Sequence, residues 1–176
     1  MEKPLVMILM GGAGSNQTYH CTKKLVQSHF PLHILACVGR KTKIIKKIEK
    51  LKRNPAVSLT CIPFTDRISD LMAVSDLLIT KPGPATTSEA AILKLPVILD
   101  ATATNIFWER GVAKFVLSNN LGREVKSLSK LNSLVEEMLF NKKIRGDIMA
   151  SFDRLPPYRF NHEIMSIIKS MCPPVA

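Results

Sequence analysis

Residues 75–90 read SDLLITKPGPATTSEA, and this stretch is the most informative part of the sequence for the fold. Its apolar segment, Leu77 to Ile79, is short and continuous, which is typical of a strand buried on both faces of a sheet. Gly83 and Pro84 predict a sharp turn after that strand, and residues 86–93 then predict a helix. Because a buried strand, a tight loop and a helix form the repeating unit of α/β proteins, the stretch predicts a parallel sheet.

The same alternation of strands and helices continues on both sides of this stretch. The predicted strands are Leu5–Met10, His33–Val38, Val57–Ile62, Leu77–Ile79, Pro96–Leu99 and Phe115–Leu117. The predicted helices cover residues 16–28, 41–53, a short segment capped by Asp66, and then residues 86–93, 106–114, 127–140, 142–152 and 162–171. This order predicts a Rossmann-like, doubly wound parallel sheet of about six strands with helices on both faces. Since no repeat or low-complexity linker interrupts the pattern, we expect one α/β domain over residues 1–176.

The composition is that of a soluble globular chain, with 46% apolar and 22% charged residues. No apolar run approaches the roughly 20 residues that span a bilayer, and the start lacks the small-residue cleavage site of a signal peptide. The four cysteines, at positions 21, 37, 61 and 172, and the four histidines show no metal-ligand or catalytic spacing. We therefore expect free thiols in a reducing, cytoplasmic compartment, with neither a disulfide nor a metal site.

The net charge is the unusual bulk property, because 25 Lys and Arg residues against 14 Asp and Glu residues give a formal +11. Such an excess favours an anionic partner, which can be a nucleic acid, an acidic membrane surface or a phosphorylated ligand. The predicted helix 41–53 contributes a basic face formed by Lys41, Lys43, Lys46, Lys47, Lys50, Lys52 and Arg53. This basic face is either simply solvated or a contact with an anionic lipid surface. One Trp, two Tyr and seven Phe, with no stacking motif among them, argue against nucleic acid as the partner.

Ligands of an open parallel sheet bind at the carboxyl ends of its strands, which points first to the loop 11–15. Its sequence is GGAGS, and glycines before a helix let the backbone approach a phosphate closely. Gln17 stands where a dinucleotide-binding motif has its third glycine, and Gly39-Arg40 replaces the acidic residue that binds an NAD ribose. Two interpretations remain open: a phosphate or nucleoside contact, and a purely structural turn from strand to helix.

The segment after Gly83 offers a second anion site. Residues 86–88, two threonines and a serine, bring hydroxyl and N–H groups to the expected helix start. Glu89 is expected within the first turn, where its carboxylate can accept hydrogen bonds from both hydroxyls of a ribose. The alternative is a capping box, with Thr86 as the N-cap and Glu89 at the third helical position. Asp100 ends a predicted strand and either contacts ligand or caps a turn.

In their order along the chain, these motifs resemble the C-terminal domain of family-28 glycosyltransferases of the GT-B type. The resemblance runs through GGAGS at 11–15, CVGR at 37–40, SDLLITKPGPATTSEA at 75–90 and LPVIL at 95–99. Within that family, the chain is most similar to the monogalactosyldiacylglycerol synthases, whose strand-loop-helix segment has a similar run. The long central motif is specific, whereas the glycine loop alone is not.

The resemblance implies the C-terminal half of a GT-B fold, which binds a UDP-sugar as donor substrate without a cofactor or a bound metal. It implies that Glu89 binds the ribose, that residues 85–87 bind the diphosphate, and that Phe64 lies in the loop around the uracil. The residues expected to bind the nucleotide are Gly12, Ala13, Gly14, Ser15, Arg40, Phe64, Gly83, Pro84, Ala85, Thr86, Thr87 and Glu89. Enzymes of the family invert the anomeric centre and act on lipid acceptors such as diacylglycerol, so we expect a cytoplasmic protein at the membrane periphery.

Two departures from the family pattern bear on the expected function. The family contacts the donor sugar through a Gln/Glu pair followed three residues later by Asn, whereas residues 108–112 read WERGV here. Only Glu109 is retained as an expected contact of the donor sugar. The family's acceptor site and catalytic base lie in an N-terminal domain outside this sequence, so no catalytic residue is expected here.

We therefore expect this chain to bind donor without turnover on its own. The acceptor-binding part is then supplied either by an N-terminal domain or by a separate subunit. Two alternatives stay open: a degenerate nucleotide-binding module without transfer activity, and an α/β domain that binds nucleic acid.

Overall fold

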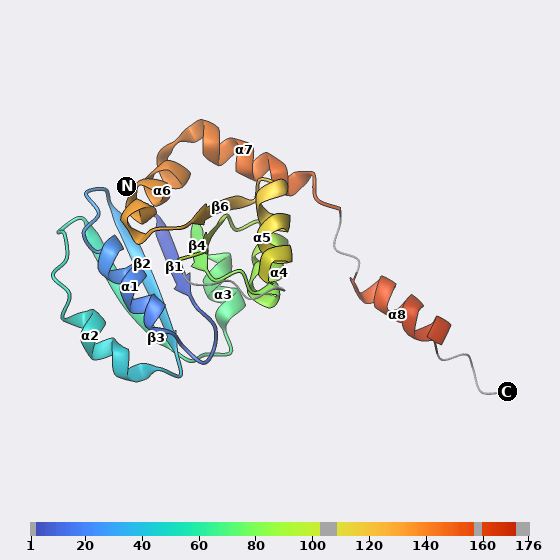
Figure 1. The fold of residues 1–176 in the computed structure, drawn as a ribbon, viewed down its shortest axis with the longest axis horizontal. Helices are drawn as coiled ribbons and strands as arrows, with labels where there is room; N and C mark the ends of the chain where they lie inside the picture. The colour runs from blue at the N-terminus through green and yellow to red at the C-terminus, as the bar shows by residue number, and fades with distance from the viewer. Residues whose placement is uncertain (1–2, 103–108, 157–159, 172–176) are drawn as a thin grey trace.

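The computed structural model describes residues 3–102, 109–156 and 160–171, and its centre is a six-stranded sheet in the order β3-β2-β1-β4-β5-β6 (Figure 1). Every neighbouring pair is parallel. The strands are β1 Leu5–Leu9, β2 Leu32–Gly39, β3 Val57–Pro63, β4 Leu77–Thr80, β5 Val97–Asp100 and β6 Gly122–Val125. The predicted fold class, a doubly wound Rossmann-like parallel sheet, is confirmed.

Helices cover both faces of this sheet, as the alternating pattern predicts. The helices of the described residues are α1 Asn16–Leu25, α2 Ile45–Glu49, α3 Ile68–Ala73, α4 Pro84–Ile92, α5 Glu109–Ser118, α6 Leu131–Phe140, α7 Lys142–Asp153 and α8 Phe160–Met171, with 3-10 turns η1 Thr42–Ile44 and η2 Leu128–Lys130. Of these, α8 lies apart from the sheet (Figure 1). Helices α1 and α2 lie against one face, whereas α4 and α5 lie together on the other (Figure 1). Within the described residues, no helix combines the length and the apolarity that crossing a bilayer requires.

The core is centred on strands β1 and β4, which lie side by side although 67 residues of sequence separate Leu9 from Leu77. Three consecutive residues of each strand are fully buried, Val6 to Ile8 in β1 and Leu77 to Ile79 in β4. From β1 the chain winds outward through β2 to β3, and from β4 it winds the other way through β5 to β6. The boundary between β1 and β4 is therefore the topological switch point, where open α/β sheets bind their ligands.

The sixth strand is not where the sequence pattern predicts it. Residues 115–117 belong to helix α5, in which Val116 is buried while Phe115 and Leu117 are exposed. Three consecutive apolar residues are typical of a buried strand. Here they lie within a helix, and only Val116 faces the core. The true edge strand begins at Gly122, where a Cβ atom would lie 2.0 Å from the carbonyl oxygen of Val97. The sequence of this strand, Gly-Arg-Glu-Val, contains no apolar run, so the apolar pattern does not predict a strand there.

Two predicted helices also differ from the structure in extent or capping. The basic segment 41–53 is not one helix but a 3-10 turn followed by the five residues of α2. Two apolar residues of this segment, Ile44 and Ile48, are buried and fix it to the core. Asp66 does not cap α3, because the N-cap position is Arg67 and no side chain hydrogen-bonds there. The backbone N–H of Arg67 donates instead to the hydroxyl of Thr65, at 3.1 Å.

Candidate functional site

A cavity of about 200 Å³ lies at the carboxyl edge of the sheet. It is lined by the loops that follow β1, β2 and β3 and by one side of α4. The lining residues are Leu9, Gly11, Gly12, Cys37, Gly39, Pro63, Phe64, Thr65, Ile68, Thr86 and Glu89. Four residues that sequence reasoning selected from three separate segments therefore meet around one space, namely Gly12, Phe64, Thr86 and Glu89.

The loop from β1 to α1 is a tight turn that also borders this cavity. The N–H of Gly14 donates to the carbonyl of Gly11 at 3.0 Å, and the N–H of Arg40 donates to the carbonyl of Gly12 at 3.0 Å. The Ser15 hydroxyl caps helix α1 by accepting from the N–H of Gln17, at 3.1 Å. Gly14 and Ser15 thus have structural roles, while exposed Gly12 lines the cavity.

An aromatic ring and a guanidinium lie together at the edge of the cavity. The Arg40 guanidinium carbon is 4.3 Å from the centroid of the Phe64 ring, which is the geometry of a cation–π contact. Phe64 is 51% exposed, so part of its surface is available to a planar ligand. A Cβ atom at Gly12 would lie 3.4 Å from this ring, at van der Waals distance, so Gly12 and the ring lie next to each other.

Helix α4 begins two residues earlier than the sequence predicts. Gly83 is the N-cap residue, Pro84 is the first helical residue, and no side chain caps the helix. Because proline fixes φ near the helical value and has no N–H, it favours the first position of a helix. The capping-box prediction is therefore wrong: Thr86 is the third helical residue rather than the N-cap.

The earlier helix start also changes the position of Glu89. It is the sixth residue of α4, beyond the first turn in which it was expected. Its carboxylate consequently has no capping role, and the exposed side chain lines the cavity. The amides of Ala85 and Thr86, at the second and third helical positions, have no acceptor within the helix and can receive an anion.

Beside α4 lies a second hollow, of about 280 Å³. Its lining residues are Pro84, Thr87, Ser88, Gly111, Val112 and Phe115. Thr87 is 3% exposed, and its hydroxyl has no hydrogen-bond partner among the described residues. Two of the residues expected to bind the diphosphate therefore line different cavities, with Thr86 in the first and Thr87 in the second.

Glu109 lies at the start of α5 and is 7% exposed. Its Oε1 atom is 3.6 Å from the Nζ atom of Lys81, which belongs to the segment that the sequence analysis singles out but has no role assigned there. The position of Lys81 directly after the central strand β4 is the feature that could have identified it. Trp108, the preceding residue of the expected sugar-binding segment, lies outside the described residues.

Asp100 has a structural role at the end of β5. Its Oδ1 atom accepts hydrogen bonds from the N–H and the hydroxyl of Thr102, at 3.0 and 2.7 Å. The Gln17 amide donates to the same hydroxyl at 2.7 Å, which ties the loop after β5 to helix α1. Of the two roles that the sequence left open for Asp100, the structure shows the turn-capping one.

The buried thiols of Cys37, which lines the cavity, and of Cys21 in α1 are not activated. Burial, with a smaller effect of Cys61, raises the pKa of Cys37 to about 12. Burial, with a smaller effect of Asp100, likewise raises the pKa of Cys21 to about 12. Both thiols therefore stay protonated at neutral pH, so neither is a ready nucleophile. Among the described residues, no three His, Cys, Asp or Glu side chains converge as a metal-binding cluster.

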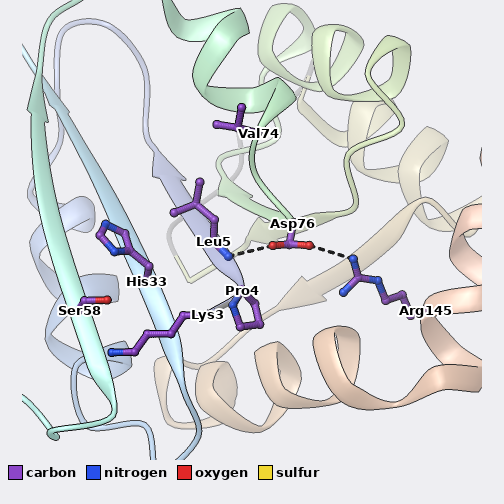
Figure 2. Close-up of a pocket in the computed structure, with 8 residues that line it drawn as sticks. All are labelled: Lys3, Pro4, Leu5, His33, Ser58, Val74, Asp76 and Arg145. Atoms are coloured by element: carbon purple, nitrogen blue, oxygen red, sulfur yellow. Dashed lines mark hydrogen bonds and ion pairs between the residues drawn. The ribbon is translucent and has the colours of Figure 1, made fainter. Parts of the chain in front are cut away.

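Another cavity, of about 690 Å³, lies at the opposite, amino edge of the sheet (Figure 2). There Asp76 accepts from the N–H of Leu5 at 2.9 Å and from the guanidinium of Arg145 at 2.9 Å. These contacts tie β1 and α7 to the start of β4 and leave Asp76 already paired. Of these two cavities, the candidate site is the one of about 200 Å³, because it lies at the carboxyl ends of the strands.

The sequence of residues 3–100 matches the model of the glycosyltransferase family 28 C-terminal domain. This range is more than half of the chain and contains β1 to β5. The chain belongs to this family. The match also spans the segments that line the candidate cavity, from Leu9 to Glu89.

Curated relatives within this glycosyltransferase family come from plants and bacteria. The monogalactosyldiacylglycerol synthase of Spinacia oleracea chloroplasts is 26% identical over 154 residues, which are 84% of this chain and 29% of that protein. A processive diacylglycerol beta-glucosyltransferase of Bacillus subtilis is 27% identical over 145 residues, which are 77% of this chain and 36% of that protein. The chain thus spans about a third of the length of these relatives.

Solved glycosyltransferases share the fold. The structure of MurG from Acinetobacter baumannii superposes with a TM-score of 0.80 at 17% identity, over 96% of this chain and 51% of that one. The rice protein Os79 in complex with UDP superposes with a TM-score of 0.60 at 14% identity, over 87% of this chain and 36% of that one. At these identities the likeness establishes the GT-B type of fold and leaves the ligand to be inferred from the site.

Proposed function

We propose that residues 1–176 form one donor-binding domain of an inverting glycosyltransferase, which takes a UDP-sugar and serves transfer of a hexose to a lipid such as diacylglycerol. The proposal rests most on the cavity at the carboxyl edge, which Phe64, Thr86 and Glu89 line together. The family to which the chain belongs supports it as well. The lipid acceptor is inferred from the names of the relatives, a monogalactosyldiacylglycerol synthase and a diacylglycerol beta-glucosyltransferase.

Each part of the nucleotide has a matching group in the site. The uracil is proposed to lie in the loop around Phe64, and the ribose hydroxyls to donate to the Glu89 carboxylate. The diphosphate is proposed to lie between the glycine loop and the first amides of α4, where the helix dipole favours negative charge. Glu109 then faces the donor sugar.

Comparing UDP with 2′-deoxy-UDP tests the ribose contact directly. A hydrogen bond to a charged group contributes about 1.5–3 kcal/mol, so we expect UDP to bind at least about tenfold more tightly than 2′-deoxy-UDP. In Glu89→Ala, UDP affinity should fall by about tenfold or more, and the preference for UDP should largely disappear. Isothermal titration calorimetry of both nucleotides measures these changes.

A matched control is Glu137→Ala, because Glu137 is also an exposed glutamate of a helix but lies in α6. It should leave both affinities unchanged. No binding of UDP by the folded chain at millimolar concentration would overturn the proposed function. Equal loss of UDP and 2′-deoxy-UDP binding in Glu89→Ala would remove only the ribose assignment.

A binding module without transfer activity is the alternative function. It is motivated by Val112, whose side chain cannot hydrogen-bond a sugar hydroxyl. This alternative expects a UDP-hexose to bind no more tightly than UDP, and it expects no transfer after addition of a matching acceptor-binding domain. The donor-binding proposal expects tighter binding of one UDP-hexose, and transfer in that reconstituted system.

The basic face is proposed to hold this domain at an anionic membrane surface from the cytoplasmic side. All seven of its side chains are exposed, and Glu49 is the only acidic residue within 41–53. The acceptor-binding part is proposed to be an N-terminal domain or a separate subunit. Nucleic acid binding is the competing explanation of the charge, and a steep salt dependence of RNA affinity would support it instead.

A further inference from the structure

Lys81 lies at the topological switch point of the sheet, next to the proposed diphosphate position. It directly follows β4. Its Cε atom would lie 3.8 Å from a Cβ atom added at Gly11, and also 3.8 Å from one added at Gly83. The aliphatic stem thus runs between the glycine loop after β1 and the N-cap residue of α4. No side chain at Gly11 or Gly83 separates this stem from the two loops.

The ammonium group of Lys81 is held near these loops by a buried carboxylate. Its Nζ atom is 3.6 Å from Oε1 of Glu109, which is 9% exposed as a side chain, whereas the Lys81 side chain is 54% exposed. Glu109 is therefore a fixed anchor, while the ammonium group keeps an open side toward solvent. A lysine ammonium has three donors, so it can retain this ion pair and still bind a second anion.

The chemistry of the surroundings selects the kind of anion. The free amides at the start of α4 and the positive end of the helix dipole favour phosphate oxygens. They supply only partial charges, equivalent to about half an elementary charge, whereas a diphosphate carries several negative charges. A full positive charge beside these amides would therefore neutralise more of the negative charge of the diphosphate.

We propose that Lys81 binds the diphosphate of the donor nucleotide and that Glu109 positions its ammonium group. This inference rests on the proposed function and adds a charged residue to the amides and glycines already assigned. It predicts that Lys81 contributes to affinity only when the ligand carries phosphates. Uridine, which has the same base and ribose, should bind independently of Lys81.

Calorimetric titration of the chain with uridine, UMP and UDP in buffer containing EDTA tests this role. In Lys81→Met, UDP affinity should fall by about tenfold or more, because a charge-assisted hydrogen bond contributes about 1.5–3 kcal/mol. UMP affinity should fall less, and uridine affinity should stay the same. Lys81→Arg should recover part of the UDP affinity, since it restores the charge. The salt dependence of UDP binding should also be weaker in Lys81→Met than in the unmodified chain.

Lys94→Met is the matched control. Lys94 is also 54% exposed and also pairs with a carboxylate, that of Asp153 at 2.6 Å, but it follows the other end of α4. It should leave UDP affinity unchanged. Equal losses of uridine and UDP binding in Lys81→Met, or unchanged UDP binding, would overturn the role of Lys81 and leave the proposed function standing. Failure of the unmodified chain to bind both UDP and uridine would overturn the two together.

Discussion

At the scale of single residues, two glycines shape the loop beside the candidate cavity. Gly14 and Gly39 have φ angles of +81° and +58°, a region that L side chains rarely adopt. A Cβ at Gly14 would lie 2.2 Å from the Val38 carbonyl oxygen, and one at Gly39 would lie 2.5 Å from the Gly12 carbonyl oxygen. The loops after β1 and β2 can therefore pack together only with glycine at both positions.

Gly14→Ala is expected to destabilise the fold. A strained positive φ costs about 1–3 kcal/mol, and the overlap with backbone atoms adds to it, so we expect a loss of about 2 kcal/mol or more in the free energy of unfolding. Urea denaturation followed by circular dichroism measures the loss.

Gly146→Ala is the matched substitution for this test. Gly146 lies within helix α7, and a Cβ there meets nothing within 4 Å. It should raise stability by roughly 0.5–1 kcal/mol, since alanine favours a helix interior. Similar stabilities of the two variants would contradict the close approach described for Gly14.

At the scale of secondary-structure elements, Asn141 links two consecutive helices. It is the C-cap residue of α6 and the N-cap residue of α7. Its Oδ1 atom accepts from the N–H groups of Lys143 and Ile144, at 3.1 and 3.2 Å. This capping satisfies two amides of α7 that have no acceptor within the helix, and it fixes the point at which the chain changes direction.

Asn141→Ala should therefore lower the free energy of unfolding by about 1 kcal/mol, the usual effect of losing an N-cap side chain. Asn141→Asp keeps the accepting oxygen and should retain most of the stability. Thermal and urea unfolding of the three proteins measure the difference. If alanine and aspartate had equal effects, the hydrogen bonds of Oδ1 would not be what stabilises α7.

At the scale of the whole molecule, the sheet separates two edges with different roles. The carboxyl edge has the glycine loops, Phe64 and the start of α4, whereas the amino edge has the Asp76–Arg145 ion pair. The basic face follows directly after β2, so it begins at the carboxyl edge, beside Arg40. A membrane bound by this face would therefore lie near the mouth of the cavity.

Reversing charge on the basic face should weaken binding to anionic vesicles. The variant Lys46→Glu/Lys47→Glu/Lys50→Glu changes three exposed residues, and each lysine near an anionic surface contributes about 1 kcal/mol. We expect the affinity for vesicles that contain 30% phosphatidylserine, measured by co-sedimentation, to fall by about tenfold or more. UDP affinity should be unchanged.

The control is Lys130→Glu/Lys142→Glu/Lys143→Glu, which alters net charge equally at exposed positions of η2 and α7. It should lose less vesicle binding than the first variant. Equal losses in both would mean that total charge, and not the basic face, determines the interaction.

The sequence by itself determined the alternation of strands and helices, the parallel sheet and the family, because buried strands and tight glycine turns are local patterns. The elements that the sequence pattern predicted wrongly differ from the structure for physical reasons. The polar edge strand β6 lacks an apolar run, while residues 115–117 have one and are helical. Proline at position 84 starts α4 early, which moves Glu89 out of the first turn.

Only the tertiary structure decided which side chains meet. Phe64, Thr86 and Glu89 come from separate segments and line one cavity because parallel strands end at the same edge. Lys81 and Glu109 are 28 positions apart, and their pairing depends on how the loop after β4 meets the start of α5. Spacing along the chain does not encode such a contact, since crossover connections and packing set the distance between loops.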